Sequence, residues 1–182
     1  MATVLRKLPF FKDPSTVTVR GEQVRVKRDQ IIVWTSVSLP GQTVPAPTWP
    51  RFPAILDTGL SHNFALREEH LADWAVLPIQ SLRRLEAARL SGVAAHLFDA
   101  HLWLYRNRPG RRDDFRNAPA FGLELDEGIA VYPRGTAGAP RLPVLGLRAL
   151  RQAGLQLHID CRTCHVDLWT PRWFWLLSSA LA

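Results

Sequence analysis

An acidic, a hydroxyl and a glycine residue, Asp57-Thr58-Gly59, directly follow the apolar residues Ile55 and Leu56. A carboxylate next to an apolar run is costly to remove from water. Asp57 therefore either caps a turn or is held in a half-buried place for chemistry. In the second interpretation, the Thr58 hydroxyl fixes the loop, and Gly59, which has no side chain, lets the backbone approach a substrate closely.

Hydrolysis of a peptide bond by aspartates needs two carboxylates that share one proton around a water molecule. The chain contains one Asp-Thr-Gly triplet. One copy supplies two aspartates only when two chains meet on a twofold axis. His62 follows the triplet closely, but neighbouring residues on an extended chain face apart, so we interpret it as a loop residue rather than a base.

Two further segments accompany the triplet. The run ILDTGLSHNFAL (55–66) continues into REEHLADWAVLPI (67–79), and LPVLGLRALRQAGLQLHIDCRTCHVDLWTP (142–171) follows later in the chain. In this order the segments resemble the retropepsin-like aspartic proteases. They look most like the pepsin-like segment of gypsy-class retrotransposon polyproteins, and the resemblance covers roughly residues 31–169.

The resemblance implies an all-β fold, a retropepsin-like closed β-barrel or sandwich with one or two short helices and one catalytic aspartate per chain. It also implies an aspartic endopeptidase that acts as a homodimer, in which two Asp57 carboxylates activate a water that hydrolyses a peptide bond of an extended substrate. The alternative is a catalytically silent relative, whose fold serves as a dimerisation or peptide-binding module.

The resemblance also assigns roles to the residues of the loop. Asp57 is the catalytic carboxylate, and Thr58 hydrogen-bonds across the dimer axis beneath the two aspartates. Gly59 and Leu60 line the substrate channel, and Ser61 steadies the loop.

Two segments outside the loop receive roles in the same way. The run Val144-Leu145-Gly146 packs beneath the catalytic loop, which is a structural task. A hairpin that turns near Ser91-Gly92 is the flap, which closes over the substrate, excludes water and binds the peptide through backbone hydrogen bonds.

Alternating apolar residues and turn residues predict the elements that position these groups. The predicted hairpins are 17–26 with a turn at Gly21, 83–105 with a turn at Ser91-Gly92, 121–132 with a turn at 126–128, and 155–169. Alanines at 87, 88, 94 and 95 leave a helix open for the second of these. Short strands are predicted at 31–34, 53–56 and 142–145, and helices at 67–76 and 148–153, the latter ended by Gly154. Five prolines predict an irregular loop over 40–53.

With 182 residues, 47% of them hydrophobic, the chain suits a single domain, 1–182, with an N-terminal arm (1–16) and an apolar C-terminal tail (171–182). The tail contains WFWLL, which is either a dimer contact or a membrane-surface anchor; we favour the dimer contact. The whole apolar stretch WFWLLSSALA is about half the length of a membrane span. The first residues lack the apolar core of a signal peptide, which predicts a cytoplasmic protein.

The formal net charge of +7 comes from twenty arginines and three lysines, which are scattered along the sequence. Nucleic-acid binding rests on this charge alone, so we expect no nucleic-acid partner. Cys161 and Cys164, with His158 and His165 nearby, could form a zinc site. There is no second Cys-x-x-Cys pair, and the segment falls at the turn of a predicted hairpin. We therefore interpret it as structural and expect no metal or cofactor.

Overall fold

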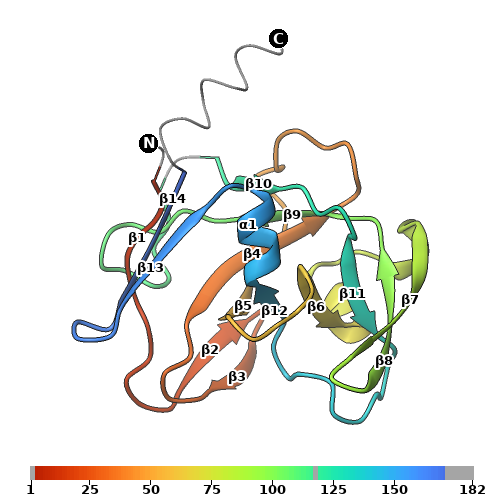
Figure 1. The fold of residues 1–182 in the computed structure, drawn as a ribbon, viewed down its shortest axis with the longest axis horizontal. Coiled ribbons are helices and arrows are strands. Elements are labelled where there is room, and N and C mark those ends of the chain that lie inside the picture. Colours follow the sequence, from red (N-terminus) through yellow and green to blue (C-terminus); the bar gives the residue numbers. More distant parts are fainter. Residues whose placement is uncertain (1–2, 117–118, 171–182) are drawn as a thin grey trace.

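The computed structural model describes residues 3–116 and 119–170 of the 182-residue chain. Within them the chain is mainly β-structure with short helices (Figure 1). The strands are β1 (Thr3–Pro9), β2 (Ser15–Val19), β3 (Glu22–Val26), β4 (Ile32–Ser38), β5 (Phe52–Asp57), β6 (Phe64–Arg67), β7 (Arg84–Leu90), β8 (Val93–Phe98), β9 (His101–Leu104), β10 (Phe121–Leu123), β11 (Ile129–Tyr132), β12 (Val144–Gly146), β13 (Gln156–Asp160) and β14 (His165–Trp169). The helices are the π-helix η1 (His70–Trp74), the 3₁₀-helix η2 (Ile79–Ser81) and the α-helix α1 (Leu147–Gln152).

Three sheets organise these strands. The largest has nine strands in the order β10-β9-β4-β5-β12-β6-β11-β8-β7, while β1-β14-β13 form a second sheet and β2-β3 a hairpin. The prediction of an all-β chain with short helices is confirmed. The predicted closure into a barrel is not found among the described strands, because β10 and β7 each pair with one neighbour and leave the large sheet open at both ends.

Two hairpins turn at the residues that the sequence predicted. Arg20 and Gly21 have φ of 49° and 88°, and Ser91 and Gly92 have φ of 50° and 82°. Each pair forms the whole connection between its strands, since Val19 pairs with Glu22 and the β7–β8 ladder closes on either side of Ser91-Gly92. Two left-handed residues in a two-residue loop match the right-handed twist of the flanking strands.

The predicted hairpin over 121–132 is wrong. β10 pairs with β9, whereas β11 lies between β6 and β8. The turn at 126–128 packs against the end of β8 instead. The contact is so close that a Cβ at Gly128 would lie 2.0 Å from the Phe98 carbonyl oxygen. Long-range pairing with β8 therefore outweighs the local turn signal.

Other boundaries differ by a few residues. The predicted helix over 67–76 is shortened to residues 68–74, which end in η1, because Arg67 still belongs to β6. Part of the predicted N-terminal arm, residues 3–9, is β1, which pairs with β14. The irregular loop over 40–51, the helix ended by Gly154 and the last hairpin are confirmed. The predicted C-terminal tail, 171–182, lies outside the described residues.

The arrangement that positions the site is an insertion of β12 between β5 and β6 (Figure 1). The segment 58–63 joins β5 to β6 directly in sequence, yet the two strands do not pair with each other in the sheet. β12 runs parallel to β5, with Gly146 opposite Asp57, and antiparallel to β6, with Leu145 opposite Phe64. Leu145 and Phe64 are fully buried, so this three-strand unit is fixed by the core.

The charged segment 106–116 is anchored by a buried asparagine. The Asn107 side chain is 2% exposed; its Oδ1 accepts a hydrogen bond from Arg6 N, and its Nδ2 donates to the carbonyl oxygens of Arg6, Arg108 and Arg111. The segment is thereby held against β1. Satisfying a buried amide in this way avoids the cost of an unpaired polar group.

His70 begins η1 and is buried against the ring of Trp74, with 4.3 Å between the ring centroids. Its Nδ1 accepts a hydrogen bond from Arg67 N, so its Nε2 carries the proton and donates to Arg141 O. Burial lowers the pKa of His70 from 6.5 to about 4, because the charged imidazolium loses its hydration. The fold thus requires the neutral form.

We expect His70 to make the fold sensitive to acid. His70 takes up a proton near pH 6.5 in the unfolded chain and only near pH 4 in the folded chain. Its contribution to the free energy of unfolding is therefore fully present above about pH 6.5 and is lost as the pH falls towards 4. The loss amounts to about 3 kcal/mol. Urea unfolding at pH 7.5, 5.5 and 4 measures it. His70→Gln removes this component, whereas the exposed His158→Gln keeps it; parallel pH curves for all three proteins would contradict the assignment.

Candidate functional site

Asp57 is the last residue of β5 and is exposed in the single chain, while its neighbour Leu56 is buried. Its Oδ1 accepts a hydrogen bond of 2.8 Å from Gly59 N. Of the two interpretations of the sequence, the turn cap is thus present, whereas the carboxylate is exposed rather than half-buried. Among the described residues, no hydrogen bond to the other carboxylate oxygen, Oδ2, is found.

The rest of the predicted loop lies around this carboxylate. Thr58 and Gly59 are exposed, and Leu60 is half-buried. Ser61 Oγ and His62 Nδ1 share a hydrogen bond of 3.2 Å, so both side chains are engaged within the loop. This hydrogen bond holds the His62 ring against its neighbour in the loop.

The predicted flap and the loop meet at one apolar cluster. Leu60 packs against a buried group that includes Leu90, and Val93 packs on the same group from the other side of the hairpin turn. Ser91 and Gly92 form the turn between Leu90 and Val93 and are exposed. The end of the β7–β8 hairpin next to its turn thus shares an apolar cluster with Leu60, while the turn residues are exposed.

Gly146 supports the loop from beneath. Its N–H donates a hydrogen bond of 2.9 Å to Asn63 O. A Cβ at this position would lie 2.1 Å from the His62 carbonyl oxygen and 3.0 Å from that of Leu60. With a φ of −87°, any residue could adopt this backbone, so glycine is required here by space alone.

A polar network that the sequence did not predict ties the loop to α1. Asn63 Nδ2 donates to Asp126 Oδ1 at 3.1 Å, Arg148 Nη2 lies 3.8 Å from Asp126 Oδ2, and Arg148 also pairs with Glu127. The hydrogen bond from Asn63 lowers the pKa of Asp126, and the charge of Arg148 adds to the effect. No local signal could have found the network, since its residues are far apart in sequence.

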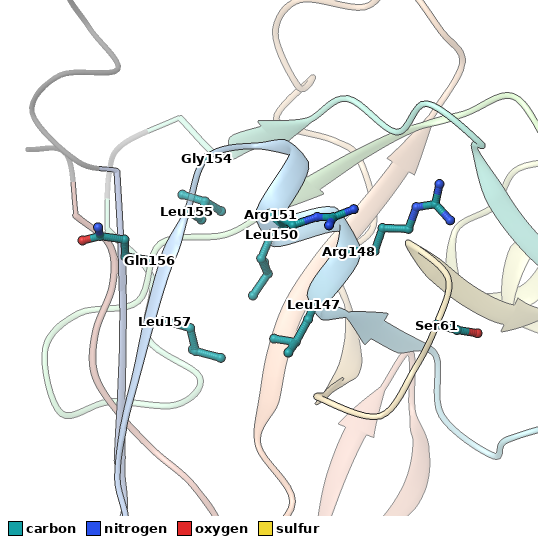
Figure 2. Close-up of a pocket in the computed structure, with 9 residues that line it drawn as sticks. All are labelled: Ser61, Leu147, Arg148, Leu150, Arg151, Gly154, Leu155, Gln156 and Leu157. Atoms are coloured by element: carbon teal, nitrogen blue, oxygen red, sulfur yellow. The ribbon is translucent and has the colours of Figure 1, made fainter.

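An apolar groove of about 730 Å³ opens next to the loop, between α1 and β13 (Figure 2). Leu147, Leu150 and Leu157 point into it, whereas the guanidinium groups of Arg148 and Arg151 are directed away. Leu147 is 37% exposed and directly follows Gly146, the partner of Asp57 in the sheet. The groove therefore places apolar surface close to the carboxylate.

The cysteines occupy the turn between β13 and β14. Cys161 and Cys164 are free thiols, and Cys164 has a φ of 56°. Asp160 stabilises the turn by accepting hydrogen bonds from the backbone N–H groups of Arg162 and Thr163. In the part of the chain that the structure describes, no group of three or more His, Cys, Asp or Glu residues could hold a metal ion.

We expect Gly146→Ala to displace the loop. The added methyl must push away a backbone carbonyl, which cannot rotate aside like a side chain, so the variant should lose about 2 kcal/mol or more of unfolding free energy. Chemical denaturation measures the loss. Gly59→Ala is the matched control, because its Cβ would meet its nearest atom at 3.4 Å. Equal stability of the two variants would show that Gly146 does not support the loop.

Comparison of the chain with known proteins gives no further assignment. No protein-family model, no curated protein and no solved structure matches it. Among the described residues, no helix is long and apolar enough to cross a membrane. The function must therefore be inferred from the site itself.

Proposed function

We propose that the protein is an aspartic endopeptidase of the retropepsin-like type that acts as a homodimer. The observation that carries this proposal is the three-strand unit around Asp57. An exposed carboxylate ends β5, its loop folds over Gly146, and the inserted strand β12 holds that loop from beneath. The order of motifs in the sequence, with SHNF after the triplet and HIDC near the end, supports the same conclusion.

The chemistry requires a second carboxylate. Two Asp57 side chains that face each other across a twofold axis cannot both be ionised at close range, so they share one proton. The ionised carboxylate removes a proton from a water, whose oxygen attacks the carbonyl carbon of the peptide. The other carboxylate protonates the leaving nitrogen, and the C–N bond breaks to give a carboxylic acid and an amine. The pair titrates as a unit rather than as two separate groups.

The apolar groove supports the dimer. An exposed leucine beside a polar catalytic loop is unfavourable in water, and a second copy that covers Leu147 brings the two loops together. Dimerisation would also take the two Asp57 carboxylates out of water. The half-buried environment that the sequence suggested then belongs to the dimer and not to the protomer.

The β7–β8 hairpin supports a role in substrate binding. It lies at the edge of the large sheet, where β7 pairs only with β8 among the described strands and leaves its other backbone groups open to an extended peptide. Leu90 and Val93, which flank its turn, share an apolar cluster with Leu60. A small movement of the hairpin is thus coupled to the catalytic loop by packing.

Asp57→Asn tests the catalytic role. The amide keeps the shape of the side chain but cannot remove a proton from water, so cleavage should fall at least about a thousandfold. A diverse peptide mixture is incubated from pH 3 to 8, and the products are identified by mass spectrometry. Asp13→Asn, which removes an exposed carboxylate elsewhere, should cleave like the wild type. If the wild type forms dimers and cleaves nothing, the silent binding module replaces the enzyme.

Leu147→Asp tests the dimer face. A charge buried in an apolar contact costs several kilocalories per mole unless it is paired, so the dimer should weaken at least about tenfold and cleavage should fall with it. Sedimentation velocity over a range of protein concentrations gives the dissociation constant. Val44→Asp is the control, since Val44 is 67% exposed in the loop before β5. A Leu147→Asp protein that dimerises normally would exclude this face.

A further inference from the structure

A second cleft is lined by positively charged residues, and the proposed catalytic mechanism gives it no role. This basic cleft, of about 670 Å³, is surrounded by Arg25, Lys27, Arg28 and Arg141. Ile55 and Leu142 contribute apolar surface to it, and no Asp or Glu lines it. Four cations around one opening raise the local potential and attract an anion.

Arg25 and Arg141 also line a neighbouring pocket that contains Glu22, Glu69 and Asp73, but no ion pair joins them to these carboxylates in the described part of the chain. Among the described residues, the side chains of Arg25, Lys27 and Arg141 make no ion pair and no hydrogen bond, and Arg28 has only an exposed contact of 3.6 Å with Asp29. By comparison, Arg83, Arg108 and Arg148 each pair with a carboxylate elsewhere on the molecule. The basic cleft thus holds unpaired donors that a ligand can use.

The basic cleft adjoins the face of β5 that carries Asp57. Ile55 is two residues before Asp57, and alternate residues of a strand point to the same side, roughly 7 Å apart. Ile55 pairs with Val144 of β12, and Leu142 precedes that residue by two positions. Ala139 lines the cleft and belongs to the apolar cluster that Leu60 contacts. The cleft therefore shares β5 and one apolar cluster with the catalytic loop.

We infer that the basic cleft selects peptides with acidic side chains close to the bond that is cleaved. This inference rests on the proposed function and names its substrate class. Two residues of an extended peptide span roughly 7 Å, so a Glu or Asp one to three positions from the reacting carbonyl reaches the cleft when that carbonyl lies at Asp57. Arginine presents paired N–H donors that match a carboxylate in one plane.

An acidic peptide fits the cleft better than a nucleic acid does. Single-stranded nucleic acids bind to grooves that combine positive charge with aromatic side chains on which the bases stack. The lining of the basic cleft has no aromatic residue and offers Ile55, Leu142 and prolines instead. These suit the aliphatic part of a peptide beside its carboxylate.

The test measures binding and cleavage separately. Two fluorescein-labelled peptide mixtures are randomised over uncharged residues, with a fixed Glu-Glu pair in one and Gln-Gln in the other. Binding to Asp57→Asn protein, which does not turn over, is followed by fluorescence anisotropy. The Glu mixture should bind about tenfold tighter than the Gln mixture. The preference should disappear in a protein that also carries Arg25→Gln and Arg141→Gln.

The matched control carries Arg111→Gln and Arg162→Gln, which remove the same charge from exposed positions on other segments. It should retain the full preference for Glu. Equal binding of the two mixtures, or an equal loss in the control, would overturn the inference, because the effect would then be one of net charge. Tighter binding of a single-stranded oligonucleotide that depends on Arg25 and Arg141 would overturn the assignment to peptides.

Cleavage by the protein with intact Asp57 separates this inference from the proposed function. Glu preference in binding without any cleavage would refute the endopeptidase and retain the acidic-peptide cleft. Cleavage at sites without nearby acidic residues, unchanged by Arg25→Gln and Arg141→Gln, would retain the endopeptidase and refute the cleft. Cleavage sites enriched in nearby Glu and Asp, with the enrichment lost in the double variant, are the expected result.

Discussion

The candidate site depends on the close contact between Gly146 and the carbonyl groups of the loop that follows Asp57. β12 can lie between β5 and β6 only if the loop joining them passes over its end, and that crossing leaves no space for a side chain. The hydrogen bond from Gly146 N to Asn63 O closes the crossing. Everything that we propose for Asp57 follows from this geometry, because it fixes where β5 ends and which way the loop turns.

The same crossing places groups from distant parts of the chain around the carboxylate. α1 starts where β12 ends, so Leu147 and Arg148 directly follow Gly146, and their side chains point in different directions (Figure 2). Arg148 then pairs with Asp126 and Glu127, and Asp126 in turn accepts a hydrogen bond from Asn63 at the end of the loop. The lack of space for a side chain at Gly146 thereby fixes the position of the exposed Leu147 and of the polar network from Arg148 to Asn63.

Acidic pH favours the proposed pair of aspartates but destabilises the fold. A pair of aspartates that shares one proton functions in mildly acidic conditions, because one carboxyl group must stay protonated while the other is ionised. Burial of His70 makes the fold less stable over the range from pH 6.5 to 4. The fold therefore limits how far into acid the site can work, unless dimerisation or a bound peptide adds stability.

The sequence alone determined the local features of this protein. The turns at Arg20-Gly21 and Ser91-Gly92, the helix ended by Gly154 and the end of the apolar strand at Asp57 all depend on residues close together in the chain, so local backbone preferences specify them. The tertiary structure alone decided the rest. The order of strands, the brace from Asn63 to Asp126 and the assembly of the basic cleft from residues 25–28, 55 and 139–142 bring together segments that are far apart in sequence. Such long-range pairings are chosen by the packing of the whole core, and this is also why β11 pairs with β8 and β6 rather than with β10.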